Sequence, residues 1–545
     1  MSKLTYKLFK TALSATQARR YRSMMRAAES PRGTQDAVLR RILAANAETE
    51  FGREHGLASV ASVSDFRQAV PVLTYEDLRE AIERQELTGE RCLTNEQPVY
   101  YHRTSGTVGA PKNIPVTASG LAQMKRDQRL SAYVWARDSG VLEGKVFAIS
   151  GAAVEGHMDG GTPFGSASGL LYRHQSRFVQ SRYVLPAEVS DIEDYDARYL
   201  AMAAYGLAEP GVTGAATANP STFLRLLSVV HDNADAMLGA IASGKLPGAA
   251  SHLALTPRPE RARELERRLS AAGRLTYADI WPGLRGIVTW TGGSCGIALG
   301  NLSPLLPDGV QIIEWGYSSS EFRGTLNVDV GRNACLPTFL NTFFEFAERD
   351  AWEANTGEFL CLDELEDGRE YYVFVTTGDG LYRYDINDIV RVNGWVGNTP
   401  TFGFVQKGKG VTNITGEKVT EAQVLNVVTS AFAATGAPPE FFIMLADEAA
   451  SGYTLYVETP ASAFAKGDAA NEIDGLLSVS NIEYESKRKS GRLAPLRVRL
   501  LPDGAGGRYR ESCVASGQRD AQFKYLHLQY VRDCAFDFDA IAVGE

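Results

Sequence analysis

The stretch YHRTSGTVGAPKNIP places the strongest constraint on what this chain can fold into. Thr104, Ser105 and Thr107 supply hydroxyl groups around Gly106, and Lys112 follows. Hydroxyls, a glycine that allows close backbone approach and a nearby ammonium group together predict a cradle for phosphate oxygens. The alternative is a simple turn rich in Ser, Thr and Gly, which the same residues also fit.

This stretch differs from the common phosphate loop. That loop has four residues between its first glycine and a Gly-Lys-Ser/Thr ending. Here only two residues separate Gly106 from Gly109, and Pro111 stands directly before Lys112. A nucleotide site built on these residues is therefore of another type.

The length and charge of the chain limit its class. Its 545 residues exceed what one core usually carries, so two or more domains are expected. The formal net charge of −9 argues against binding nucleic acid through a basic surface, and favours a small-molecule partner. No apolar run approaches the ~20 residues of a membrane span, so no membrane partner is expected. Nothing in the sequence implies an oligomer.

Cysteine and histidine usage indicates neither a metal centre nor a disulfide framework. The six cysteines include no close pair, which suits a reducing compartment. The seven histidines form no metal-ligand or nucleophile pattern, so none is assigned a chemical role. The first 26 residues are basic and could imitate a transit peptide, but we interpret them as a surface helix. A cytoplasmic location is therefore expected.

Alternation of short apolar runs with helical patterns predicts an α/β fold. The expected strands include VFAIS, GIVTW and QIIEWG, and helices are expected over 34–48 and after a capping box at Thr74. Another helix is expected from Thr256, with Pro257 in its first turn. The segment YYVFVTTGDGLYRYDINDIVRV contains two β-rich runs around a Gly-Asp-Gly turn.

A domain boundary is expected where glycines interrupt the segment after these strands. Gly408 and Gly410 mark a hinge, so we divide the chain into a large domain at 1–404 and a small α/β domain at 405–545. In the small domain, Thr420 and Gln423 form a capping box for a helix that should end at Gly436. Strands are expected at FFIML, YTLYVE and LRVRLL.

Three further polar stretches carry candidate ligands. Gly292 and Gly293 lie in TGGSCG, directly after an expected strand, where backbone could lie against a flat ring. The run from Tyr317 to Glu321 follows another strand, and ligands bind at the carboxyl ends of strands in α/β sheets. It also contains Ser318, Ser319 and Ser320. Glu321 could bind Mg²⁺ beside a nucleotide, and Asp388 could accept hydrogen bonds from both ribose hydroxyls. Solvated surface loops are the alternative for each.

Taken together, these stretches resemble the adenylate-forming superfamily, and more closely the auxin-responsive family of acyl-acid amido synthetases. The resemblance covers nearly the whole chain. Its matching segments are TEFGREHG, VPVLTYEDL, TSGTVGAPKNIP, WTGGS, the Tyr-x-x-x-Glu motif from 317 to 321, GLYRYDINDIV, GEKVTE, NIEYESKR and QFK. The segment at 154–172 is similar to the bacterial branch of the family, so indole acetate and jasmonate are not assumed as substrates.

The resemblance implies a role for each matching residue. It assigns Thr104, Ser105, Gly106 and Thr107 to the ATP phosphates, Tyr317 to Glu321 to nucleotide and Mg²⁺, Asp388 to the ribose, and Phe404 to the nucleotide site. Lys418 resembles a phosphate-directed lysine beyond the hinge, and Lys524 resembles the C-terminal catalytic lysine, carried by a mobile small domain. The implied reaction joins a carboxylic acid to the amine of an amino acid through an acyl-adenylate.

The residue chemistry agrees with this route. A carboxylate that attacks a phosphate brings two anions together, and Lys112, Lys418, Lys524 and Mg²⁺ could offset that charge. The sequence also departs from the family pattern, since Arg103 precedes the loop and QFK continues into YLHL. Two alternatives remain open: an acyl-CoA synthetase, and a non-catalytic relative that binds nucleotide.

Overall fold

A computed structural model of the chain describes residues 3–104, 112–246, 248–292, 295–408, 410–433, 439–459, 469–515 and 525–543. These residues form two compact units. The first contains described residues up to 103 together with 112–405, and the second contains Thr104 and the described residues from Gln406 onward. Each unit has its own buried apolar core. The mixed α/β fold class predicted from the sequence is confirmed.

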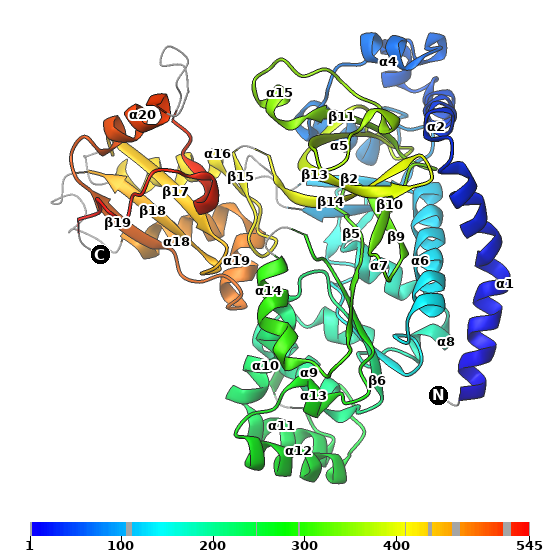
Figure 1. Ribbon diagram of the computed structural model, residues 1–545, viewed down its shortest axis with the longest axis vertical. Helices are drawn as coiled ribbons and strands as arrows, with labels where there is room; N and C mark the ends of the chain where they lie inside the picture. The colour runs from blue at the N-terminus through cyan, green and yellow to red at the C-terminus, as the bar shows by residue number, and fades with distance from the viewer. Residues whose placement is uncertain are drawn as a thin grey trace. The chain divides into compact units, whose positions relative to one another are not determined.

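Helices form the first part of unit 1. They are α1 (Lys3–Ala27), α2 (Pro31–Asn46), α3 (Glu50–Glu54), α4 (Val63–Ala69) and α5 (Tyr75–Thr88). The predicted capping box at the start of α5 is confirmed, because the Thr74 amide donates to Asp77 Oδ2 at 2.7 Å. Helix α1 lies alongside α6 (Ala118–Asp138) in Figure 1. Among the described residues, no helix is both long and apolar enough to cross a membrane.

A small mixed sheet contains the strand that ends at Thr104. Its order is β2 (Lys112–Thr117), β1 (Pro98–Thr104), β5 (Pro163–Gly165) and β4 (Gly156–His157). Strand β1 runs parallel to β5, and β4 is antiparallel to β5. Helix α6 follows β2 directly, and Thr117 caps it by accepting a hydrogen bond from the Gly120 amide.

A parallel sheet forms the α/β core of unit 1. Its order is β3 (Lys145–Ala148), β6 (Val212–Ala216), β7 (Gly286–Thr289) and β8 (Gln311–Glu314). All neighbouring pairs are parallel, so the four carboxyl ends lie at one edge. The sheet packs against α9 (Tyr195–Ala208), α10 (Ser221–Asp232), α11 (Ala234–Ser243) and α12 (Pro259–Ala272). Figure 1 shows these helices in the green part of the ribbon.

The start of α12 corrects one prediction. The helix begins at Pro259 and not near Thr256, so Pro257 lies outside it. Arg258 has φ −136° and ψ 68°, because a residue that precedes proline is disfavoured in the helical region. Its amide donates to the Ile241 carbonyl at 2.8 Å, which holds this segment against α11.

An antiparallel sheet completes unit 1. Its order is β11 (Phe343–Glu348), β12 (Glu370–Thr376), β13 (Tyr384–Val396) and β14 (Thr399–Lys407), and the hairpin of β9 (Thr325–Asp329) and β10 (Ala334–Pro337) precedes it. The two β-rich runs predicted around the Gly-Asp-Gly turn are β12 and β13, which pair in antiparallel. Aromatic side chains fill its core, including Phe344, Phe346 and Phe402.

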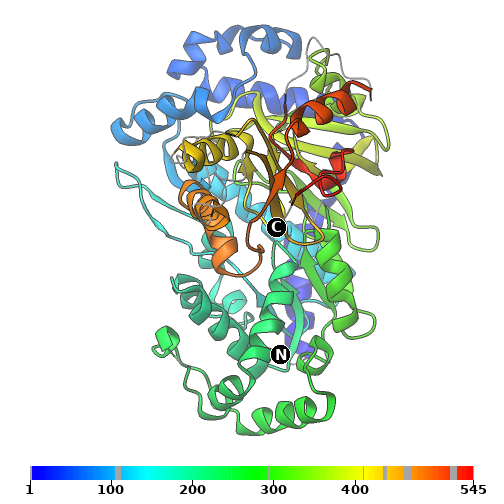
Figure 2. The same ribbon diagram turned by 90° about the vertical axis from the view of Figure 1, so that its left-hand side faces the viewer.

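Unit 2 is a four-stranded sheet covered by helices on both faces. Its order is β19 (Arg497–Leu501), β18 (Gly452–Glu458), β17 (Phe441–Asp447) and β20 (Leu528–Tyr530). The helices α16 (Glu421–Ala433), α18 (Ala469–Ser480) and α19 (Ile482–Lys489) pack on one face, and α20 (Ala505–Ala515) packs on the other (Figure 2). The predicted strands and the capping box at Thr420 are confirmed. Gly436, the predicted end of α16, lies outside the described residues.

A buried ion-pair cluster connects three elements of unit 1. The side chain of Glu345 on β11 is only 1% exposed and lies 2.8 Å from Arg67 Nε on α4 and 2.9 Å from Arg383 Nε. Arg383, just before β13, has a side chain 4% exposed and also donates to the Val70 carbonyl at 2.9 Å. Its backbone has φ 41°, a left-handed value that few non-glycine residues adopt.

Glu345→Gln should strongly destabilise unit 1. The substitution leaves the buried Arg383 without its counter-charge, and breaking a buried pair costs about 3–5 kcal/mol. Urea unfolding followed by tryptophan fluorescence measures the change. Glu366→Gln is the matched control, because Glu366 pairs with Arg369 at the surface and is 65% exposed. The control should change stability by less than about 0.5 kcal/mol. Equal unfolding midpoints for the two variants would contradict this role of Glu345.

Candidate functional site

Strand β1 contacts the loop that follows β8. The buried ring of His102 donates from Nδ1 to the Ser320 carbonyl at 2.9 Å. Burial lowers the pKa of His102, which favours the neutral ring, and a neutral ring that donates to a carbonyl from Nδ1 carries its proton there. The two stretches that the sequence assigned to phosphate and to nucleotide are thus joined through His102.

His102 is a residue that the sequence interpretation missed. No histidine stands in a metal or nucleophile pattern, so the sequence alone indicates no role for this one. The one available signal was its place in a strand two residues before Thr104, which ends β1. The contact with Ser320 spans 218 positions, so only the folded chain reveals it.

Glu314 ties together the carboxyl ends of two parallel strands. Its Oε2 accepts from the Thr291 amide after β7 at 2.8 Å, and its Oε1 accepts from the Gly316 amide after β8 at 2.8 Å. Gly292 lies beside this pair. A Cβ atom at Gly292 would come within 2.4 Å of the Phe404 carbonyl oxygen, so glycine is needed for the strand β14 to pass this closely.

The loop from Tyr317 to Glu321 is held in a narrow turn. The Tyr317 amide donates to Thr325 Oγ1 at 2.8 Å, and the Ser319 amide donates to the Phe322 carbonyl at 3.0 Å. Ser318 forms a backbone bridge with Arg323. These bonds fix the backbone of the predicted nucleotide loop at the carboxyl edge of the parallel sheet.

Asp388 and Tyr317 are brought together as a buried pair. Asp388 on β13 is 2% exposed, and its Oδ2 accepts a hydrogen bond from the Tyr317 hydroxyl at 2.6 Å. The Tyr317 ring stacks on Phe404, with ring centres 5.9 Å apart and planes at 15°. Three residues that the sequence assigned to the nucleotide therefore meet, and Tyr317 supports Asp388 while its own ring is buried.

Negative charge gathers around this pair. Burial raises the pKa of Tyr317 well above its ordinary value, and the charges of Asp388 and Glu321 raise it further. Burial and the charge of Glu321 act in the same way on Tyr384. A divalent cation would be attracted here. The donor set fits Mg²⁺, which commonly takes one or two carboxylates together with phosphate oxygens and water.

Asp127 on α6 lies within electrostatic reach of Arg323, which follows this loop. It is buried and accepts a hydrogen bond from Gln123 Nε2 at 2.7 Å. Burial raises the pKa of Asp127 to about 6, although the charges of Arg323 and Arg126 oppose the shift. Arg323, two residues after Glu321, donates to Ser131 Oγ on α6 at 2.9 Å. Helix α6 therefore holds the segment that directly follows the loop.

The remaining predicted residues do not all enter this cluster. Lys112 begins β2, and its Nζ lies 5.7 Å from the centre of the Tyr75 ring on α5, so its role toward phosphate stays a prediction. Lys418 belongs to unit 2, where it immediately precedes β16 (Val419–Thr420). Ser105, Gly106, Thr107, Gly293 and Lys524 lie outside the described residues.

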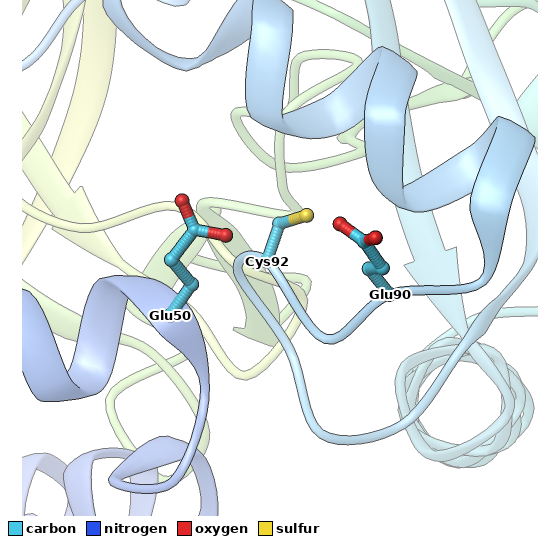
Figure 3. Close-up of side chains that lie close together, drawn as sticks. All are labelled: Glu50, Glu90 and Cys92. Atoms are coloured by element: carbon cyan, nitrogen blue, oxygen red, sulfur yellow. The ribbon is translucent and has the colours of Figure 1, made fainter.

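One group of possible metal ligands has another explanation. Figure 3 shows Glu50, Glu90 and Cys92, whose ligand atoms lie within 4.8 Å of one another. The guanidinium of Arg84 already pairs with Glu50 Oε2, lies 3.4 Å from Glu90 Oε2 and donates to Cys92 Sγ at 3.3 Å. We interpret the group as an ion-pair cluster that fastens α3 to the end of α5.

Polar loops at the carboxyl ends of parallel strands suit a small-molecule ligand. Comparison with known families identifies the chain more closely. Residues 20–308 match the GH3 family N-terminal domain, 335–407 match the GH3 family central domain, and 422–532 match the GH3 family C-terminal domain. The first match alone spans more than half of the chain, and the chain therefore belongs to the GH3 family.

Individual relatives agree with this family. The chain is 28% identical over 432 residues to indole-3-acetic acid-amido synthetase GH3.15 of Arabidopsis thaliana, covering 73% of this chain and 71% of the relative. It is 24% identical over 543 residues to the 4-substituted benzoates-glutamate ligase GH3.12 of the same plant, covering 90% and 91%. A solved structure of the GH3.15 acyl acid amido synthetase has the same fold, with a TM-score of 0.63, 23% identity and coverage of 98% and 97%.

Asp127→Asn should change how stability depends on pH. The folded-state pKa of about 6 lies above the ordinary value of 3.8, so the protonated carboxyl adds stability at low pH that is lost as pH rises from about 4 to about 6. The asparagine cannot ionise. Relative to the parent, the variant should therefore gain roughly 1.4 kcal/mol per unit of pKa shift between these pH values.

Unfolding free energies at pH 4 and pH 7 measure this difference. Asp308→Asn, at an exposed position, controls for the loss of one negative charge. A constant difference between the Asp127 variant and its parent at both pH values would contradict the raised pKa.

Proposed function

We propose that the chain is an ATP-dependent acyl-acid amido synthetase. It adenylates a carboxylic acid, transfers the acyl group to the amine of an amino acid, and releases pyrophosphate and AMP. The observation that carries the proposal is the hydrogen bond between Tyr317 and Asp388, which unites two predicted nucleotide residues 71 positions apart at the carboxyl edge of the sheet. Membership of the GH3 family supports the same activity.

In the proposed complex, Asp388 accepts hydrogen bonds from the ribose hydroxyls. Its carboxylate is already oriented by Tyr317, so little reorganisation accompanies binding. Phe404 stacks on Tyr317 and Gly292 lies against the Phe404 backbone, and we assign both to the flat surface for the base. The hydroxyl loop, for which we propose Thr104, Ser105, Gly106 and Thr107, holds the phosphates.

Glu321 is the proposed Mg²⁺ ligand. When bound, the ion neutralises charge on the phosphates and so assists the departure of pyrophosphate. The chain itself contributes the carboxylate, and the turn through Ser319 and Phe322 fixes its position. Residue charges at this edge favour a cation over a further anion.

The first half-reaction joins two anions. A carboxylate oxygen of the acid bonds to the α-phosphorus of ATP, and the bond from that phosphorus to the bridging oxygen of pyrophosphate breaks. We assign Lys418 and Lys524 to offset the charge that develops on the phosphate oxygens. In the second half-reaction the amine nitrogen bonds to the acyl carbon, the bond to AMP breaks, and the amine proton passes to solvent.

The two half-reactions need different surroundings for one site. We propose that residues 405–545 form a mobile domain that brings Lys524 to the α-phosphate and then moves away to admit the amine. Gly408 and Gly410 near the start of unit 2 support such a hinge. A cytoplasmic location is proposed as well, supported by six cysteines that form no disulfide.

Names of relatives suggest where a substrate search should begin. Relatives are named for indole-3-acetic acid and for 4-substituted benzoates with glutamate, so aromatic carboxylic acids and acidic amino acids are the first candidates. The test is ATP–pyrophosphate exchange over a panel of carboxylic acids, followed by mass spectrometry with amino acids or CoA added. Amide products support the proposal, thioester products identify an acyl-CoA synthetase, and no exchange with any acid identifies a relative that only binds nucleotide.

Asp388→Ala should raise the Michaelis constant for ATP. Loss of a charged acceptor from the ribose forfeits roughly 1.5–3 kcal/mol of binding. Tyr317→Phe should also raise the Michaelis constant for ATP, but by less, because the Asp388 carboxylate remains. Steady-state kinetics measure both. Asp385→Ala on the same strand is the control, since that carboxylate accepts from the Asn387 amide. If ATP affinity is unchanged in Asp388→Ala, the ribose assignment is wrong.

Lys524→Ala should damage the two half-reactions unequally. Its charge is needed only while the adenylate forms, so the turnover number of that step should fall by a factor of order 10² to 10³, with little change in either Michaelis constant. Supplied with synthetic acyl-adenylate, the variant should still acylate the amine at nearly the parent rate. Single-turnover kinetics on both steps make the comparison. Lys489→Ala, on the exposed side of α19, is the control. Equal damage to both steps would show that Lys524 is structural.

A further inference from the structure

Lys418 has a backbone conformation that must be held by its surroundings. Its φ is 48°, in the left-handed region that costs a non-glycine residue roughly 1–2 kcal/mol. Residues that keep such a conformation cluster at functional sites, where the surrounding structure over-determines them. Hydrogen bonds within unit 2 identify the side chains that hold this backbone.

Glu417 fixes the backbone that precedes Lys418. Its side chain is fully buried and turns back onto its own loop, where it accepts from the Ile414 amide at 2.6 Å and from the Thr415 amide at 2.7 Å. The Tyr453 hydroxyl on β18 donates to the same carboxylate at 2.5 Å. The loop before Lys418 is therefore closed and anchored to the sheet.

Asn481 also fixes the backbone around Lys418. It is 1% exposed and stands at the N-terminus of α19, where Oδ1 accepts from the Glu483 amide at 3.1 Å and from the Tyr484 amide at 3.0 Å. Its Nδ2 donates to the Glu417 carbonyl at 2.8 Å and lies 3.3 Å from the Lys418 carbonyl. One amide thus caps a helix and binds both peptide groups that flank the Lys418 side chain.

The same helix turn places charge near the lysine. Burial alone would raise the pKa of Glu483, but the positive charges of Lys487 and Lys418 hold it below its ordinary value. Lys487 Nζ lies 2.7 Å from Glu483 Oε2. The first turn of α19 therefore acts on the Lys418 backbone through Asn481 and on its ammonium through Glu483.

We propose that Asn481 is a positioning residue for Lys418 in adenylation, acting through its Nδ2 bonds to the carbonyls of Glu417 and Lys418. The inference rests on the proposed function, in which Lys418 stabilises charge on the phosphate. Without these bonds the backbone leaves its left-handed conformation, and the ammonium is displaced from the direction in which the loop presents it. A displacement of about 1 Å can cost on the order of 100-fold in rate.

Two variants separate the helix-capping role of Asn481 from its hydrogen bonds to the carbonyls of Glu417 and Lys418. Asn481→Ser and Asn481→Asp both retain an oxygen that caps α19, and neither retains the donor that reaches the two carbonyls. The serine adds no charge and the aspartate keeps the side-chain shape, so agreement between them excludes charge and cavity effects. Both should lower the turnover number of adenylation roughly 10- to 100-fold and leave the Michaelis constant for ATP nearly unchanged. Glu485→Ala, at a surface ion pair of the same helix, is the control.

A double-mutant cycle with Lys418→Met tests whether Asn481 acts through the lysine. In the Lys418→Met background, Asn481→Ser should cause no further loss of adenylation. Additive losses would overturn the inference and leave the proposed function intact. Full activity of Lys418→Met would overturn both the role of Lys418 and the inference.

Hydrogen exchange tests the hydrogen bonds from Asn481 to the two carbonyls without reference to activity. Exchange of the peptide at 411–420 should accelerate in Asn481→Ser, and exchange over α20, on the other face of the sheet, should not change. Unchanged protection of the 411–420 peptide would overturn the inference even for a protein that adenylates none of the acids tested.

Discussion

The hydrogen bond from Tyr317 to Asp388 is the interaction on which the candidate site depends. Both groups are buried, and a buried carboxylate that loses a donor costs about 1–3 kcal/mol, so the bond stabilises the folded state. It joins β13 of the antiparallel sheet to the loop after β8 of the parallel sheet. Two sheets formed by separate segments therefore fix one another, and the candidate nucleotide residues lie where they meet.

The same principle governs the surroundings of this bond. Glu314 satisfies amide groups at the ends of β7 and β8, and His102 satisfies the Ser320 carbonyl. Backbone that leaves the edge of a parallel sheet exposes polar groups that need partners. Side chains that supply those partners also set the course of each loop, so the geometry of the site follows from hydrogen-bond satisfaction.

In unit 2, buried polar side chains likewise fix the loop that carries Lys418. Glu417 and Asn481 are buried and use their polar atoms on the peptides that flank Lys418, whose side chain is only partly buried. Rigid backbone beneath a long side chain reduces the freedom that must be lost when the ammonium meets an anion. The units are therefore built alike, with chemistry on loops and orientation supplied by buried polar side chains.

Local patterns in the sequence determined the elements and the polar loops between them. The capping boxes at Thr74 and Thr420, the strands of both units and the placement of Tyr317 to Glu321 after β8 followed from residue order alone. The start of α12 was predicted wrongly, because Pro257 and Pro259 can each occupy the first turn of a helix. Tertiary structure alone decided that His102 meets Ser320, and that Tyr317, not solvent, orients Asp388. These contacts join residues 218 and 71 positions apart, so they arise only when the packed fold brings the partners together, and burial then strengthens each hydrogen bond.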